Sequence, residues 1–179
     1  MGEQRKMNKA PVHVLFVCLG NICRSPTAHG VFAHLVRQHG LQQQILIDSA
    51  GTGDWHIGRA PDPRTCTAAS QRGYDLSALR ARQVCAEDFY RFDYILAMDT
   101  QNLRDLQQLQ RLQPPHSRGE LALFLSYGAA GKHGSSHEVP DPYHGEEDSF
   151  EHVLDLVENA SQHFLQMLIE RHGLIRSAE

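Results

Sequence analysis

Four short apolar runs, each followed at some distance by a stretch of helical character, most constrain how this chain can fold. The runs are rich in Val, Ile and Leu, which is typical of strands buried on both faces of a parallel sheet. Pro, Gly and polar residues separate these runs from the helical stretches. The expected strands are residues 12–17, 45–47, 94–98 and 121–125, and the expected helices are residues 26–40, 63–73, 101–112 and 149–172.

Strands that alternate with helices along a chain indicate βαβ units. The sequence therefore predicts an α/β fold: a three-layer open twisted sheet of four parallel strands with helices on both faces, flavodoxin- or Rossmann-like. The length of 179 residues suits one compact domain. We expect residues 1–11 to form a flexible N-terminal tail and residues 12–179 to form a single domain.

Composition excludes several classes of protein. The formal net charge of −4 argues against broad, non-specific binding of nucleic acid, which needs a basic surface. The four cysteines are too few for a disulfide scaffold, and none of them forms a CxxC pair. The sequence contains neither a secretory leader nor an apolar run long enough to span a membrane. We expect a cytoplasmic protein with free thiols and no membrane span.

The segment between the first strand and the first helix carries the strongest chemical signal. Cys18 is followed by five residues and then by Arg24 and Ser25. A loop of this length can turn successive N–H groups into one concavity, which binds anions, and the following helix adds its positive end. Arg24 offers a planar fork for two phosphoryl oxygens, and the positive field favours the nucleophilic thiolate of Cys18. The expected phosphate-binding residues are Leu19, Gly20, Asn21, Ile22, Cys23 and Ser25.

A second signal lies far down the chain, at Asp141-Pro142-Tyr143. A carboxylic acid can donate a proton to a leaving phenolate, so Asp141 is a candidate general acid. Asp before Pro is also typical of a plain turn, and that alternative would be preferred without the first motif.

The two motifs, in this order along the chain, resemble those of the low-molecular-weight protein tyrosine phosphatases. The resemblance extends to the segments 48–55, 80–83 and 92–103. It implies hydrolysis of phosphotyrosine and of aryl phosphates through a phosphocysteine on Cys18. Arg24 would stabilise the phosphoryl oxygens, and Asp141 would act first as acid and then as base. The resemblance implies no metal and no other cofactor.

Four further residues receive supporting roles. Trp55 and Tyr143 are candidate walls of the substrate cleft, although Trp55 could equally be ordinary surface or partial core. Ser49 is expected to support the phosphate-binding loop. Asp99 is expected to cap the helix that follows it, with support of the loop as the alternative.

The sequence departs from the family pattern at two places. His144 stands where many relatives carry a second aromatic residue, and Leu79 stands where bacterial relatives commonly carry a histidine that holds the loop. Neither departure changes the expected nucleophile, the arginine or the expected acid. Cys23 leaves two interpretations open: a reversible disulfide with Cys18, which the resemblance supports, or a small side chain that fits its place.

Two rival functions and one metal site fit the sequence less well. A thiol-dependent arsenate reductase would need closely spaced additional cysteines, which Cys66 and Cys85 do not provide. A phosphate-binding module or a phosphocysteine carrier would not need Asp141. A metal site at His133 and His137 lacks further ligands.

The expected partners are a tyrosine-phosphorylated protein, for which a bacterial tyrosine autokinase is a candidate, and a phosphate or another oxyanion in the loop.

Overall fold

The structure is a computed structural model that describes residues 9–128 and 136–176. Its centre is a four-stranded parallel sheet with the order β2-β1-β3-β4. The strands are β1 (Val12–Cys18), β2 (Ile45–Gly51), β3 (Tyr94–Ala97) and β4 (Glu120–Leu123). The helices are α1 (Arg24–Gln38), α2 (Pro63–Gln71), α3 (Asp88–Arg91), α4 (Thr100–Arg111) and α5 (Glu147–His172), with a 3₁₀ turn, η1 (Phe124–Tyr127). The predicted α/β class with a four-stranded parallel sheet is confirmed.

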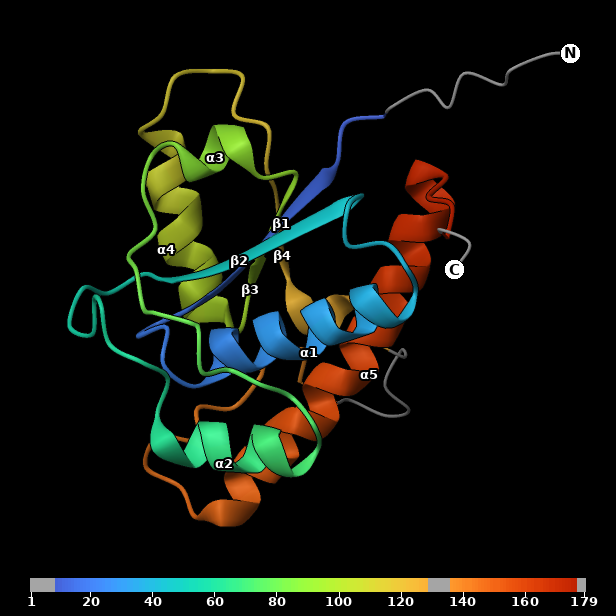
Figure 1. The fold of residues 1–179 in the computed structure, drawn as a ribbon. Helices are drawn as coiled ribbons and strands as arrows, with labels where there is room; N and C mark the ends of the chain where they lie inside the picture. The colour runs from blue at the N-terminus through green and yellow to red at the C-terminus, as the bar shows by residue number, and fades with distance from the viewer. Residues whose placement is uncertain (1–8, 129–135, 177–179) are drawn as a thin grey trace, which may run out of the picture.

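Helices cover both faces of the sheet, with α1, α2 and α5 on one side and α3 and α4 on the other (Figure 1). The alternation of side chains along β1 explains this arrangement. Val14 and Phe16 are buried in the cluster that includes Phe32 of α1. Leu15 and Val17 are buried in the opposite cluster. A strand that is apolar on both faces is stable only when both faces are covered, so β1 occupies the interior of the sheet.

β2 is longer than the sequence predicts. Its pairing with β1 continues through Cys18 and Gly51, so Ser49 lies within the strand and not in a loop after it. The polar pair Asp48-Ser49 interrupts the apolar pattern from which the shorter strand was predicted. β2 is an edge strand, where polar side chains reach solvent or neighbouring helices while the main chain stays paired. The short helix α3 was not predicted, and β4 ends two residues early, where η1 begins.

The topology brings distant segments to one edge of the sheet. The carboxyl ends of β1 and β3 lie side by side, because Val17 pairs with Ala97. The chain leaves β1 at Cys18, and Asp99 follows β3 and caps α4 by accepting a hydrogen bond from the N–H of Asn102 at 2.7 Å. This is the edge at which open parallel sheets bind their ligands.

Most of the expected N-terminal tail, and His133 of the considered metal pair, lie outside the described residues. No helix within residues 9–128 and 136–176 is long and apolar enough to cross a membrane. In the same ranges, no three His, Cys, Asp or Glu side chains gather in an arrangement that could hold a metal ion.

Candidate active site

The phosphate loop, residues 18–25, connects β1 to α1 and ends inside the first turn of that helix. Helix α1 begins at Arg24, two residues earlier than the sequence predicts, so the loop is directly continuous with the positive end of the helix. Cys18 and Arg24 are both buried, with 3% and 4% of their surfaces exposed. The candidate nucleophile and the arginine therefore both lie at the base of the site, largely shielded from solvent.

Donors from outside the loop determine which way its peptide groups point. The carbonyls of Cys18 and Leu19 accept from the N–H groups of Thr52 and Gly53, each at 2.9 Å, and the carbonyl of Ile22 accepts from the N–H of Asp62 at 2.8 Å. In a trans peptide the C=O and N–H groups point in opposite directions. The N–H groups of the residues that follow these carbonyls, Leu19, Gly20 and Cys23, therefore point toward the inside of the loop, as an anion-binding concavity requires.

Asn21 stabilises the tightest part of the loop. Its φ of 56° lies in the left-handed region, which Asn tolerates better than most residues. The side chain is buried, and both of its polar groups are used: Nδ2 donates to Ser25 Oγ at 2.8 Å, and Oδ1 accepts from the N–H of Arg82 at 3.0 Å. Both the backbone and the side chain of Asn21 are therefore used to hold the turn of the loop.

The Sγ atom of Cys18 lies 3.0 Å from Ser25 Oγ and 3.3 Å from the N–H of Asn21. Ser25 Oγ already accepts a hydrogen bond from Asn21, so its single proton is available as a donor. The competing acceptor, the carbonyl of Ala50, is more distant at 3.4 Å. Two donors can therefore face the sulfur, which stabilises a thiolate.

Arg24 is held from the side opposite the loop. Its Nη1 atom donates to Asp99 Oδ2 at 2.6 Å and to the carbonyl of Val139 at 3.2 Å. Burial opposes the charge of Arg24, but the nearby Cys18 and Asp99 more than offset this effect, and the pKa of Arg24 is raised. Asp99 also caps α4, as expected from the sequence, while its support of the phosphate loop remains a prediction.

Asp141 lies on the acid loop, residues 138–145. The N–H of Val139 donates to the carbonyl of Met98 at 2.7 Å, and Glu138 Oε1 accepts from the N–H of Thr100 at 2.8 Å. Both contacts fix the start of the acid loop to the end of β3. Asp141 Oδ2 lies 3.6 Å from Arg24 Nη2, and the carboxylate is 47% exposed. The acid is thus beside the arginine and open to the cavity.

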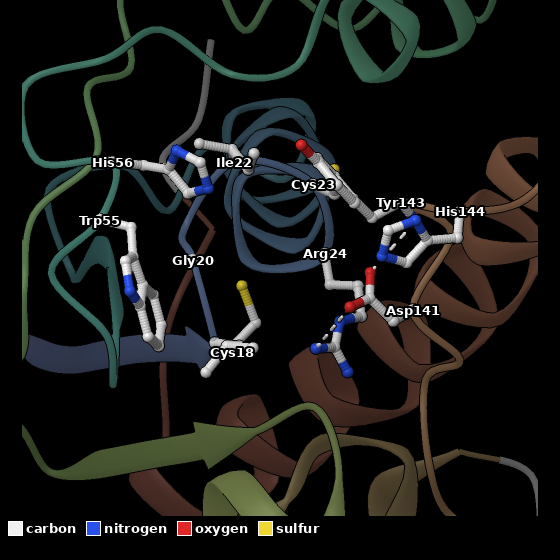
Figure 2. A pocket seen from close by; sticks show the side chains of 11 residues that line it. Cys18, Gly20, Ile22, Cys23, Arg24, Trp55, His56, Asp141, Tyr143 and His144 are labelled. Carbon is white, nitrogen blue, oxygen red and sulfur yellow. Dashed lines mark hydrogen bonds and ion pairs between the residues drawn. The ribbon is translucent and has the colours of Figure 1, made fainter.

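The cavity above Cys18 has a volume of about 300 Å³. Figure 2 shows Trp55 and His56 on one side of Cys18, with Asp141, Tyr143 and His144 on the other. Its lining residues come from the phosphate loop, from the segment after β2 and from the acid loop: Cys18, Leu19, Gly20, Ile22, Cys23, Arg24, Trp55, His56, Asp141, Tyr143 and His144. The sequence-predicted nucleophile, arginine, acid and cleft walls are therefore brought together.

Two expected residues have environments that the sequence did not suggest. Ser49 Oγ hydrogen-bonds to His29 Nδ1 of α1 at 3.1 Å, so this contact does not reach the phosphate loop. Its supporting role remains a prediction. Cys23 is a free, buried thiol, as Cys18 is, and burial raises its pKa to about 12. Both interpretations of Cys23 remain predictions.

Sequence reasoning missed several residues that shape the site. His56 lines the cavity, and Thr52, Gly53, Asp62 and Arg82 bind the phosphate loop through their main-chain N–H groups. Any residue except proline can donate a hydrogen bond through its main-chain N–H, so the sequence does not reveal such contacts. A signal did exist for Asp62, because Asp before Pro63 is typical of a helix N-cap, and its carboxylate caps α2.

A Cys-x₅-Arg loop at the start of a helix, with a carboxylic acid facing it, defines the class of cysteine-dependent phosphatases. The family model described as "Low molecular weight phosphotyrosine protein phosphatase" matches residues 13–173. This chain therefore belongs to the low molecular weight phosphotyrosine protein phosphatases, and the family and enzyme class predicted from the sequence are confirmed.

Individual relatives agree with this assignment. The chain is 44% identical over 158 residues to the low molecular weight phosphotyrosine protein phosphatase of Schizosaccharomyces pombe, covering 88% of this chain and 97% of the relative. A crystal structure of a protein tyrosine phosphatase from Entamoeba histolytica superposes with a TM-score of 0.81 at 36% identity, covering 91% and 99% of the two chains. A crystal structure of DARP, described as drosophila arginine phosphatase, gives a TM-score of 0.80 at 34% identity, covering 86% and 96%.

Proposed function

We propose that this protein hydrolyses phosphotyrosine in proteins through a phosphocysteine intermediate on Cys18. The observation that carries the proposal is the position of Cys18 Sγ, 3.0 Å from Ser25 Oγ, at the base of a cavity that Arg24 and Asp141 also line. The nucleophile, the phosphoryl-binding groups and a proton donor thus share one space of suitable size for an aryl phosphate.

In the first step, the thiolate of Cys18 attacks phosphorus and the bond to the phenolic oxygen breaks. Asp141 gives its proton to that oxygen, so the product leaves as a neutral phenol. Arg24 and the inward-pointing amides stabilise the charge on the equatorial phosphoryl oxygens. This arrangement needs no cofactor, because the loop and the arginine supply the positive field.

In the second step, water attacks the phosphocysteine and the S–P bond breaks. The carboxylate of Asp141 takes a proton from the water, which regenerates the acid, and the sulfur leaves as a thiolate. Ser25 Oγ, within hydrogen-bond distance of Sγ, stabilises the leaving thiolate. Inorganic phosphate is then released from the loop.

Trp55 and Tyr143 are proposed to hold the aromatic ring of the substrate. They lie on opposite walls of the cavity and are 66% and 42% exposed, so part of each side chain is open to the cavity (Figure 2). Aromatic pairs gain about 0.5–1.5 kcal/mol beyond the burial of area, which favours an aryl over an alkyl phosphate.

The proposed substrate is a tyrosine-phosphorylated protein, and a tyrosine autokinase is one candidate of that class. The proposed location is the cytoplasm, because turnover requires reduced Cys18 and all four cysteines are free thiols. The fold is also similar to that of a protein described as an arginine phosphatase. Phosphoarginine is therefore the competing substrate to test.

The proposal is tested by release of 4-nitrophenol from 4-nitrophenyl phosphate, with EDTA and a reductant present. We expect metal-independent turnover that Cys18→Ser abolishes while phosphate binding remains. Turnover that persists in this variant would contradict the role of Cys18. Matched phosphotyrosine and phosphoarginine peptides then decide the substrate class, and arsenate with thioredoxin tests the reductase alternative.

A further inference from the structure

Arg64 fastens the acid loop to the body of the protein. It lies in the first turn of α2, and its Nη2 atom donates to the carbonyl of Tyr143 at 3.0 Å. The guanidinium also lies over two rings, with its central carbon 5.6 Å from the centre of Tyr143 and 4.8 Å from the centre of Phe150 in α5. Such cation–π contacts attract the guanidinium to the ring faces and help to keep it in place. The acid loop is thereby tied to α2 and α5 through one side chain.

Asp62 holds Arg64 in this position. Its Oδ1 accepts from Arg64 Nε at 3.0 Å and its Oδ2 accepts from Nη2 at 2.9 Å, the bidentate geometry that orients a guanidinium. The hydrogen bond from Arg64 is the main reason that the pKa of Asp62 is lowered, so the pair is fully charged at neutral pH. The main-chain N–H of Asp62 donates to the carbonyl of Ile22. The Asp62–Arg64 pair therefore joins the phosphate loop to the acid loop.

The main chain of Tyr143 carries this connection to the acid itself. Its carbonyl accepts from Arg64, and its N–H donates to Asp141 Oδ1 at 3.2 Å. The other oxygen of Asp141 faces Arg24 at 3.6 Å. A displacement of Tyr143 would therefore move the carboxyl group that is proposed to donate the proton.

We propose that Arg64 is a positioning residue for general acid catalysis, because it fixes the acid loop relative to Cys18. This inference rests on the proposed role of Asp141. A residue that only stabilises the fold would lower the rates of all substrates alike. A residue that positions the acid matters most for substrates whose leaving group needs the proton.

The test compares kcat/KM for three substrates whose phenols differ in acidity: phenyl, 4-nitrophenyl and 2,4-dinitrophenyl phosphate. For Arg64→Ala we expect a loss of about tenfold with phenyl phosphate and less than about twofold with the dinitrophenyl ester, since small misplacements of a catalytic group cost up to about a hundredfold. Arg64→Lys should recover part of the loss, because it keeps the cation but not the fork.

Two further variants sharpen the comparison. Asp62→Asn removes the charge that orients Arg64 but keeps a good N-cap for α2, so we expect the same substrate pattern at smaller amplitude. Arg111→Ala changes net charge by the same amount at an exposed position in the last turn of α4, and should leave all three rates unchanged.

Asp141→Asn separates the inference from the function on which it rests. If Asp141→Asn shows no dependence on the leaving group, Asp141 is not the acid and the proposed mechanism fails. If Asp141→Asn shows the dependence but Arg64→Ala slows all three substrates equally, or slows none, then the positioning role of Arg64 is overturned while the mechanism stands.

Discussion

Arg24 and Asp99 form the closest charged contact of the site, with 2.6 Å between Nη1 and Oδ2. The two residues lie at the starts of α1 and α4, and their contact joins the ends of β1 and β3. Asp99 thereby orients the arginine that is proposed to bind the phosphoryl oxygens. The contact leaves the Nη2 side of Arg24 facing Asp141.

Asp99→Asn should weaken catalysis without unfolding the protein. Asn caps a helix as well as Asp does, so the N-terminus of α4 stays satisfied. The ion pair with Arg24 becomes a weaker hydrogen bond from the guanidinium to a neutral amide oxygen. We expect kcat/KM to fall about tenfold, the energy of one such bond, and the inhibition constant of phosphate to rise. Steady-state kinetics and thermal unfolding measure both effects. A loss of stability with unchanged kinetics would contradict an orienting role for Asp99.

Asn21→Ala and Asn21→Gly should differ, because the backbone of residue 21 has a φ of 56°. Both variants lose the hydrogen bonds to Ser25 and from Arg82. Only Ala also pays the cost of a left-handed conformation, about 1–2 kcal/mol. We therefore expect Asn21→Ala to be the less stable and the less active of the two. Urea unfolding and the affinity for phosphate provide the measurements, and equal values for the two variants would exclude strain at this position.

Alkylation by iodoacetate at neutral pH should select Cys18. Burial raises the pKa of Cys23 to about 12 and also raises the pKa values of Cys66 and Cys85, so these three thiols stay mostly protonated at neutral pH and react slowly. Peptide mapping by mass spectrometry identifies the modified residue. Phosphate in the loop should slow the reaction, and Cys18→Ser should remove the fast phase. Rapid labelling of Cys23 in the wild type would show that its thiol is more accessible than its burial indicates.

His29 should make the stability of the fold depend on pH. Burial lowers the pKa of His29 below 6.5, although Asp48 acts in the opposite direction, and the ring packs against Ser49 Oγ. Below pH 6.5 the unfolded chain therefore binds a proton more readily than the native chain does. The free energy of unfolding then decreases as the pH falls through this window, by up to about 1.4 kcal/mol per pH unit.

His29→Gln removes this titration and keeps a polar group near Ser49. Urea unfolding of both proteins between about pH 5 and 8 isolates the effect, because the other titrating groups are common to both. The difference in free energy between wild type and variant should shrink as the pH falls. A difference that is constant with pH would show that His29 is protonated equally in the folded and unfolded chains.

Local sequence predicts the elements and the chemistry of the phosphate loop. The run from Val12 to Val17 is apolar on both faces and must be covered by helices, so the layered fold follows from it. The position of the loop between a strand and a helix was also predicted, although α1 begins at Arg24, two residues before the predicted start. The nucleophile, the arginine and the acid were thus named from short motifs alone.

Only the tertiary structure decides how these parts are held together. The carbonyls of the phosphate loop are turned outward by N–H groups about 30 to 40 residues further along the chain, and Arg64 and Tyr143 meet across an even longer separation. Main-chain donors have no side-chain signature, and long-range partners are selected by packing between elements rather than by local propensity. The sequence by itself predicted the candidate reacting groups and the order of the strands and helices along the chain. The distances and orientations of these groups were set by the long-range contacts that form on folding.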